Sequence, residues 1–194
     1  MILNDIKRCG WVDMSNPLYI EYHDKEWGVP IHRDKKLFEM LILEGAQAGL
    51  SWATILKKRQ NYRKAFDRFD YKKIAGYDGK KINILLKNEG IVRNKLKIMS
   101  AVRNAKVVIE IIKEFGSLDK YIWSFVDFKP IQNNFRTIGE IPAKTTLSDE
   151  ISKDLKKRGT NFTGPTIIYA FMQAVGLVND HQVDCYRYKE LRSG

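Results

Sequence analysis

Hydrophobic residues recur along most of this chain at the spacing of an amphipathic α-helix. Leu37, Phe38, Leu41 and Ile42 share one helical face, and Asp34 just before them is of a type that caps helix N-termini. Strands would instead need apolar and polar residues to alternate, and no convincing run of this kind is found. The hydrophobic pattern therefore predicts an all-α fold.

Capping residues, prolines and glycines divide the rest of the chain into further helices. Ser148 is expected to open one of them, and Gly90 to end another in the left-handed conformation. Prolines and a glycine between residues 127 and 146 predict an irregular stretch there. The predicted helices span residues 34–48, 51–59, 78–88, 94–115, 117–123, 148–158 and 165–175.

The charge balance is strongly basic, with 34 Lys and Arg residues against 23 Asp and Glu and a net charge of +11. A surplus of this size favours a polyanionic partner, because each cation set against a phosphate releases counterions. The alternative is a solvated, lysine-rich surface without such a partner, and charge alone does not separate the two. A membrane surface is disfavoured, because no segment combines a basic face with a strongly apolar one.

The chain shows no membrane or export signal. Its longest apolar run, residues 37–50, is interrupted by Glu39, Glu44 and Gln47 and falls short of the ~20 apolar residues of a membrane helix. Residues 1–8 lack the apolar core and cleavage site of a secretory signal. We therefore expect a cytoplasmic protein whose two cysteines are not disulfide-bonded.

A short basic turn joins the predicted helices 78–88 and 94–115. Its apolar tip, Ile91 and Val92, should pack between the helices, so that the free N–H groups near Arg93 to Lys95 point outward. Lys97 should add charge to this helix N-terminus, which is a suitable site for a DNA phosphate. The turn is thus a candidate helix-hairpin-helix, and the alternative is a plain helical hairpin with an exposed basic turn.

Both cysteines and two of the three histidines form a candidate metal site. His181 and Cys185 are one helical turn apart, and Cys9 and His23 form a second pair near the N-terminus. A Cys₂His₂ set gives the closed tetrahedral geometry of a structural zinc ion. The alternative is that these are four unrelated core residues.

An acidic residue, Glu44, lies within an apolar run, so its carboxylate is expected to face the interior or a cleft. A buried carboxylate is costly unless it is paired or hydrogen-bonded. Aromatic residues are dense around it in the sequence: Trp11, Tyr19, Tyr22, Trp27 and Trp52. Such a pocket suits a flat, cationic ligand that donates hydrogen bonds, and the alternative is a structural Glu beside a purely aromatic core.

In-order motifs along nearly the whole chain resemble the 3-methyladenine DNA glycosylase I family of the helix-hairpin-helix glycosylase superfamily. The loop between Cys9 and His23 is one residue longer than in the family pattern. The motifs are RCGW (8–11), PLYI (17–20), YHDKEWGVP (22–30), KLFEM (36–40), LEGAQAGLSW (43–52), WSFV (123–126), LKKRG (155–159), FMQA (171–174) and GLVNDH (176–181).

The resemblance implies a set of site residues. Glu44 falls on the base-binding glutamate, taken here as the catalytic residue, and Leu50 is a candidate plug for the gap left by a flipped base. The hairpin residues Gly90, Arg93, Asn94 and Lys95 are expected to hold DNA. The pocket aromatics fall on Tyr19, Tyr22, Trp27 and Trp52, and the structural zinc ligands on Cys9, His23, His181 and Cys185.

The resemblance also implies an activity and an organisation. We expect a monomeric bacterial enzyme that flips 3-methyladenine out of double-stranded DNA and hydrolyses its bond to the sugar, releasing the free base. Residues 1–194 should form one unit, with the hairpin in about 34–125 and a zinc-linked lobe from 1–33 and 145–194. The rival functions are a non-enzymatic DNA-binding module, a glycosylase that also accepts 7-methylguanine or 1,N6-ethenoadenine, and a zinc hydrolase.

Overall fold

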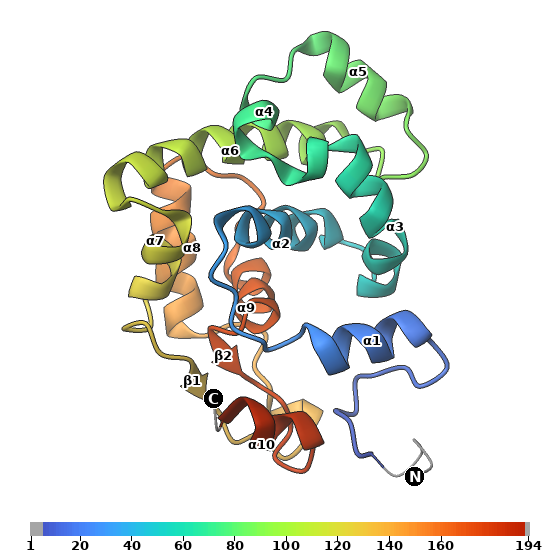
Figure 1. Ribbon diagram of the computed structural model, residues 1–194, viewed down its shortest axis with the longest axis vertical. Coiled ribbons are helices and arrows are strands. Elements are labelled where there is room, and N and C mark those ends of the chain that lie inside the picture. Colours follow the sequence, from blue (N-terminus) through green and yellow to red (C-terminus); the bar gives the residue numbers. More distant parts are fainter. Residues whose placement is uncertain (1–5, 193–194) are drawn as a thin grey trace.

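The computed structural model describes residues 6–192, which are mainly helical and are arranged around one central helix (Figure 1). The α-helices are α1 Pro17–Lys25, α2 Asp34–Gln47, α3 Trp52–Ala65, α4 Tyr71–Ala75, α5 Gly79–Lys87, α6 Lys95–Phe115, α7 Leu118–Ser124, α8 Thr146–Lys157, α9 Pro165–Ala174 and α10 Tyr186–Arg192. Two short 3-10 helices, η2 Asp67–Phe69 and η3 Ile138–Glu140, and two strands, β1 Ile131–Gln132 and β2 Val178–Asn179, complete the described part.

Helix α2 is the centre of the structure, with α6 and α9 on opposite sides of it and α3 and α7 toward its ends (Figure 1). Every residue from Leu37 to Ala46 is buried. The sequence pattern predicts one apolar face, but helices from distant parts of the chain cover this helix all round. Two acidic side chains, Glu39 and Glu44, are therefore taken into the interior with it.

Several predicted helix ends are confirmed by their caps. The side chains of Ser51, Asp78, Asn94 and Ser117 each accept the backbone N–H three residues further on, at 2.8 to 3.3 Å. Each cap satisfies one of the N–H groups that a helix start leaves free. Gly49, Gly159 and Gly176, where the sequence predicts helix ends, all have positive φ angles.

Two predicted helix starts are wrong, the first by one residue and the second by two. Asp34 is the first residue of α2 and not its cap, because its carboxylate accepts the backbone N–H of Asp119 at 2.9 Å. Ser148 does not open α8, which begins at Thr146 after the cap Thr145. The Ser148 hydroxyl accepts the N–H of Thr145 at 2.9 Å and so closes a capping box.

Gly90 does not adopt the predicted left-handed conformation, since its φ is not among the positive ones. The turn needs glycine for a different reason, which is the close approach of α3. A Cβ atom at this position would lie 2.9 Å from the Cβ of Asn61 and 3.0 Å from the Oδ1 of Asn88. Packing, and not backbone conformation, therefore excludes a side chain here.

The all-α prediction is confirmed as a mostly helical fold, but it misses several short elements, among them α4, two strands and two terminal helices. Strands β1 and β2 form a two-residue parallel pair that aligns Ile131 with Val178 and Gln132 with Asn179. Helices α1 and α10 lie beside the two ends of the described chain and were not predicted. No described helix has the length and apolar character needed to cross a bilayer.

Candidate functional site

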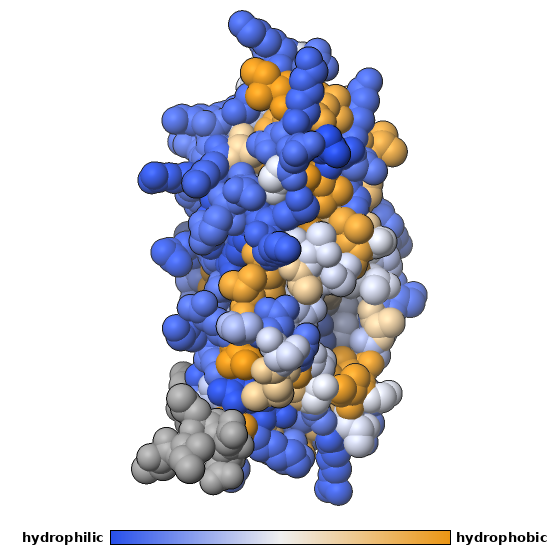
Figure 2. Space-filling model, turned by 90° about the vertical axis from the view of Figure 1, so that its right-hand side faces the viewer, coloured by the Kyte–Doolittle hydropathy of each residue, from blue (hydrophilic) through white to orange (hydrophobic). Residues whose placement is uncertain are grey.

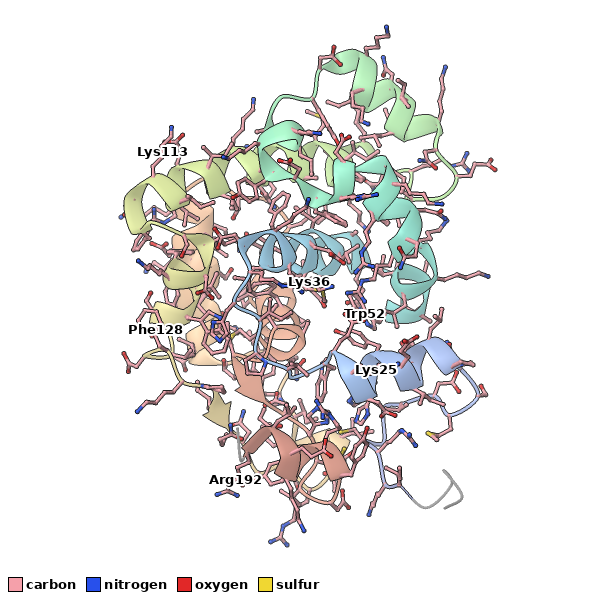
Figure 3. The ribbon with its side chains drawn as sticks, in the orientation of Figure 1. Lys25, Lys36, Trp52, Lys113, Phe128 and Arg192 are labelled. Atoms are coloured by element: carbon pink, nitrogen blue, oxygen red, sulfur yellow. The ribbon has the colours of Figure 1, made fainter. Side chains whose placement is uncertain are left out.

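A cavity of about 300 Å³ lies between α1, α2, α3 and α9. It brings together Glu44 and all four aromatic residues predicted to bind a base. Figure 3 shows Trp52 at the start of α3, where this helix faces α1. The lining residues are Trp11, Tyr19, Tyr22, Trp27, Glu44, Gln47, Trp52, Ile138, Ile141, Ala170 and Gln173.

The aromatic walls are fixed by contacts with one another. The ring centres of Tyr22 and Trp52 are 5.3 Å apart, and those of Trp11 and Trp27 are 5.0 Å apart with their edges toward faces. The hydroxyl of Tyr19 accepts the backbone N–H of Ala53 at 3.2 Å, which ties α1 to the start of α3. These contacts preorganise a slot suited to a flat ring.

Glu44 is the one acidic residue that lines this cavity, and its side chain is only 4% exposed. No described residue hydrogen-bonds to its carboxylate. Desolvation raises its pKa to about 8, and the nearby charge of Arg59 offsets part of that effect. A buried carboxylate without a hydrogen-bond partner is unfavourable in the free protein. Glu44 is therefore a candidate to hydrogen-bond to a ligand bound in the cavity.

Two indole N–H groups, on Trp11 and Trp52, are also buried without a hydrogen-bond partner among the described residues. Both side chains line the cavity. The pKa of the Tyr22 hydroxyl lies well above its usual value, first because of burial and then because of the charge of Glu44. The cavity is therefore lined by unpaired indole N–H groups, two glutamine amides and one carboxylate.

Some lining residues were not predicted. Trp11 was noted only as an aromatic neighbour, and Gln47, Ala170 and Gln173 were not singled out, although Gln47 is one turn from Glu44 and so shares its face. Ile138 and Ile141 come from the irregular segment between β1 and α8, where no periodic pattern marks a position that lines a cavity.

The four predicted metal ligands converge at one point. The ligand atoms of Cys9, His23, His181 and Cys185 all lie within 4.8 Å of one another, and all four residues are buried. The Sγ atom of Cys9 is 3.4 Å from the Nδ1 of His181, and that of Cys185 is 3.4 Å from the Nε2 of His23. This cluster could bind a metal ion, because two thiols and two imidazoles form a tetrahedral donor set.

Further hydrogen bonds turn one ring nitrogen of each histidine toward the cluster. His23 uses Nδ1 to contact Asp24 at 2.8 Å, so its Nε2 faces the cluster. His181 donates from Nε2 to the backbone oxygen of Trp27 at 3.0 Å, so its Nδ1 faces the cluster. Arg8 in turn holds Asp24 at 2.7 Å. Partners of this kind orient metal-binding histidines and increase their basicity.

The prediction that a helical turn aligns His181 with Cys185 is wrong. These residues lie in an irregular turn after β2, and α10 begins only at Tyr186. The turn closes through the backbone N–H of Cys185, which donates to Gln182 at 2.8 Å. The side chains meet nevertheless, because this turn folds back onto the segment that holds Cys9.

The basic turn between α5 and α6 is anchored by packing and hydrogen bonds, and its apolar tip is buried at Ile91 as predicted. Ile91 is buried, and the backbone N–H of Val92 donates to the hydroxyl of Tyr62 at 3.1 Å. Lys58 on α3 donates to the backbone oxygen of Glu89 at 2.7 Å. The turn is therefore fixed to α3, which also carries Trp52 of the cavity.

Lys97 does not add to the basic face of this turn, contrary to the prediction. Its ammonium group donates to the backbone oxygens of Ala46 and Ala48, at 2.9 and 2.6 Å. Arg93 and Lys95 remain exposed, with Arg93 near Glu89 at 3.4 Å. Asn94 caps α6, so its side chain is occupied by the N–H of Lys97.

The family model described as methyladenine glycosylase matches residues 11–188 of this chain. The chain belongs to the methyladenine glycosylase family. The resemblance drawn from the sequence motifs is thus confirmed at the level of this family. The helical fold, the aromatic cavity and the Cys₂His₂ cluster described above are features of a family member.

Individual relatives agree over nearly the full length of this family member. It is 49% identical to DNA-3-methyladenine glycosylase 1 of Escherichia coli (strain K12) over 183 residues, which cover 94% of this chain and 97% of the relative. A crystal structure of 3-methyladenine DNA glycosylase I matches with a TM-score of 0.90 and 48% identity, covering 93% of this chain and 98% of the other. A further structure, of a 3-methyladenine DNA glycosylase I variant in complex with 3-methyladenine, matches with a TM-score of 0.86 and 36% identity, over 88% of this chain and 92% of the other.

Proposed function

We propose that this chain excises 3-methyladenine from alkylated double-stranded DNA by hydrolysing the N-glycosidic bond. The products are the free base and an abasic site. The observation that carries this proposal is the buried, unpartnered carboxylate of Glu44 inside an aromatic cavity. The relatives named above are 3-methyladenine glycosylases, and one of their structures contains the free base.

The chemistry of the substrate explains why the cavity holds a single carboxylate. Methylation at N3 makes adenine cationic, so the base leaves as a neutral molecule and needs little protonation. Glycosidases that act on unactivated sugars need a pair of carboxylates instead. Glu44, the single acid in this cavity, accepts hydrogen bonds from the base edge and balances its positive charge.

Each aromatic residue has a role in this proposal. Trp52 stacks on the base, while Tyr19, Tyr22 and Trp27 shape the cavity around it. Water attacks C1′ of the oxocarbenium-like sugar, whose charge is stabilised by the DNA phosphates. No lysine lines the described cavity, which supports hydrolysis without a lyase step through a Schiff base.

DNA is held by the turn between α5 and α6, used as a helix-hairpin-helix. Gly90 permits the close packing of the turn, and Arg93, Asn94 and Lys95 present charge and backbone N–H groups to a phosphate. Leu50, which is 41% exposed beside the cavity, fills the gap left by the flipped base. An exposed leucine at this position is consistent with insertion into a base stack.

The Cys₂His₂ cluster holds a structural zinc ion. Cys9, His23, His181 and Cys185 supply four ligands, which leaves no position for an activated water. When bound, the ion stabilises the fold by linking the N-terminal segment to the turn after β2. Trp27 connects this cluster to the base cavity, since its backbone oxygen holds His181 and its ring lines the cavity.

The organisation follows from the same proposal. Residues 1–194 act as one monomeric glycosylase unit, with the hairpin in about 34–125 and the zinc-linked lobe from 1–33 and 145–194. The DNA substrate locates the working enzyme in the bacterial cytoplasm, on the nucleoid.

Base release from methylated DNA, with the products resolved by chromatography, tests the proposal. The wild-type chain should release 3-methyladenine in preference to 7-methylguanine. Glu44→Gln should lower the rate at least tenfold, because the amide keeps the size of the side chain but loses its charge. Glu110→Gln, at an exposed position on α6, is the matched control and should leave the rate unchanged. Wild-type protein that binds DNA but frees no base would instead indicate a DNA-binding module.

A further inference from the structure

A second cavity, here named the basic cleft, lies between the first half of α2, the second half of α3 and η2. Its volume is about 680 Å³, and it shares no lining residue with the base cavity. Six basic side chains line it against one acidic side chain. The lining residues are Arg33, Lys35, Lys36, Glu39, Gln60, Arg63, Lys64 and Arg68.

The single carboxylate that lines the basic cleft already accepts hydrogen bonds from basic side chains. The Oε1 atom of Glu39 accepts hydrogen bonds from Lys36 at 3.2 Å, Arg59 at 3.0 Å and Arg63 at 2.8 Å. Arg59 is also held by Glu26, at 2.8 and 2.6 Å. Both carboxylates are therefore already ion-paired, Glu39 with three cations and Glu26 with Arg59 and Lys36.

Four cations of the cleft stand without a partner. Arg33, Lys35, Lys64 and Arg68 are exposed, and no hydrogen bond or ion pair holds them among the described residues. Lys36 has a lowered pKa, first because of desolvation and then because of the charge of Arg59. Crowded like charges of this kind create a positive potential that attracts an anion.

The backbone brings Arg68 to the cleft in an unusual conformation. Asp67, Arg68 and Phe69 have φ angles of 47°, 55° and 58°, a left-handed run that L-residues rarely adopt. The hydroxyl of Tyr77 donates to Asp67 at 2.5 Å, and buried Phe69 anchors the other end of the run. The fold thus fixes an arginine at the cleft by a turn that costs conformational energy.

The position of the cleft relates it to the base cavity and the hairpin. All three share α3, which carries Trp52 at its start, Lys58 against the hairpin, and Lys64 at the cleft. Twelve residues of helix separate Trp52 from Lys64, a rise of roughly 18 Å. The two side chains also leave the helix about 120° apart, so the cleft lies around α3 from the base cavity as well as along it. Figure 2 shows the face formed by the right-hand side of Figure 1, where α1, α3 and α5 lie, and hydrophilic side chains cover the left part of this face.

We propose that the basic cleft binds a run of adjacent phosphate groups, and that the backbone of the substrate duplex flanking the lesion supplies them. Phosphates match a cleft with several unpaired Lys and Arg side chains, which take part in charge-assisted hydrogen bonds without reading sequence. The phosphate chemistry follows from the cleft itself. The choice of the duplex as its source rests on the function proposed above.

Equilibrium binding of an undamaged 20-base-pair duplex to the full chain, measured at several salt concentrations, tests this proposal. The test variant is Lys64→Gln/Arg68→Gln, and the matched control is Lys129→Gln/Lys153→Gln, two exposed lysines outside the cleft. A second arm measures binding of inorganic tripolyphosphate by calorimetry to the same three proteins. Thermal melts verify that all three are folded.

The cleft variant should bind the duplex about tenfold more weakly at low salt. Its slope of log K against log salt should be smaller by about 2, because two phosphate contacts are lost. The control should match the wild type in both quantities. Loss of tripolyphosphate binding with unchanged duplex binding would keep the phosphate site but overturn the duplex as its source.

Unchanged duplex slope and unchanged tripolyphosphate binding in the cleft variant would overturn the proposal entirely. Neither measurement requires base excision. A wild-type chain that fails to release 3-methyladenine would therefore count against the proposed function alone, and the two failures are distinguishable.

Discussion

The ammonium group of Lys97 donates a hydrogen bond of 2.6 Å to the backbone oxygen of Ala48. Lys97 lies in the first turn of α6, directly after the basic turn, and Ala48 follows the last residue of α2. The bond, with a second one to Ala46, satisfies carbonyl groups that the end of α2 leaves free. It fixes the expected DNA-binding turn to the helix that carries Glu44 and to the turn that carries Leu50.

Replacing Lys97 with Met should therefore destabilise the protein and weaken catalysis together. The loss of two hydrogen bonds from a charged donor is expected to cost about 1–3 kcal/mol of unfolding free energy. Misplacement of Leu50 should lower kcat more than it raises KM for damaged DNA. Denaturant unfolding and steady-state base release measure the two effects. Lys106→Met, at an exposed position on the same helix, is the control, and equal behaviour of the two variants would refute the role of Lys97.

The ionisation of Glu44 should make the stability of the free protein depend on pH. Its pKa is about 8 in the folded state against 4.5 as its ordinary value, so the folded protein holds this proton more tightly than the unfolded chain. Protonated Glu44 therefore contributes fully to the unfolding free energy below pH 4.5, and this contribution is lost as the pH rises through 8. Glu44→Gln cannot ionise and should be more stable than wild type at pH 9 by roughly 2–4 kcal/mol, with little difference at pH 4.5.

Urea unfolding of both proteins at pH 4.5, 7 and 9 measures this difference. Glu110→Gln should follow the wild type at every pH, because Glu110 is exposed. A gap between wild type and Glu44→Gln that does not grow with pH would mean that the carboxylate is not desolvated in solution.

The Cys₂His₂ cluster predicts one zinc ion per chain. Its affinity for zinc should depend on the residues that hydrogen-bond to the ligand histidines. Asp24→Asn removes the charge that orients His23, and we expect a 10- to 100-fold weaker affinity for zinc. Elemental analysis and competition with a chromophoric chelator provide the measurements. Asp184→Asn, beside Cys185 but paired only with exposed Lys7, is the control. Chain purified without zinc that melts at the same temperature as zinc-loaded chain would contradict a structural ion.

Close packing at Gly90 predicts a local cost for any side chain. Gly90→Ala places a Cβ 2.9 Å from the Cβ of Asn61, and the required shift should cost about 1–3 kcal/mol. Duplex affinity should fall with it, since the turn must move away from α3. Gly139→Ala meets no atom within 4 Å and should change neither the melting temperature nor the affinity. Identical results for the two variants would exclude a packing role for Gly90.

The sequence by itself determined the local structure. Most helix segments and several of their caps were predictable, because hydrophobic spacing and side-chain hydrogen bonds near a helix start act over a few residues. The family, the four metal-binding candidates and Glu44 could also be read from motifs. Errors at this level, such as the cap assigned to Asp34, arise where a residue distant in the chain takes the side chain away.

The tertiary structure decided how these parts meet. Only packing buries α2 on all sides and leaves Glu44 without a hydrogen-bond partner. Packing also brings Ile138 and Ile141 to the cavity. It places the ammonium group of Lys97, an expected DNA contact, against the carbonyl groups at the end of α2. Burial, desolvation and contacts between distant segments depend on the whole chain at once. No local pattern encodes them, and for the same reason the basic cleft becomes visible only when α2, α3 and η2 are placed together.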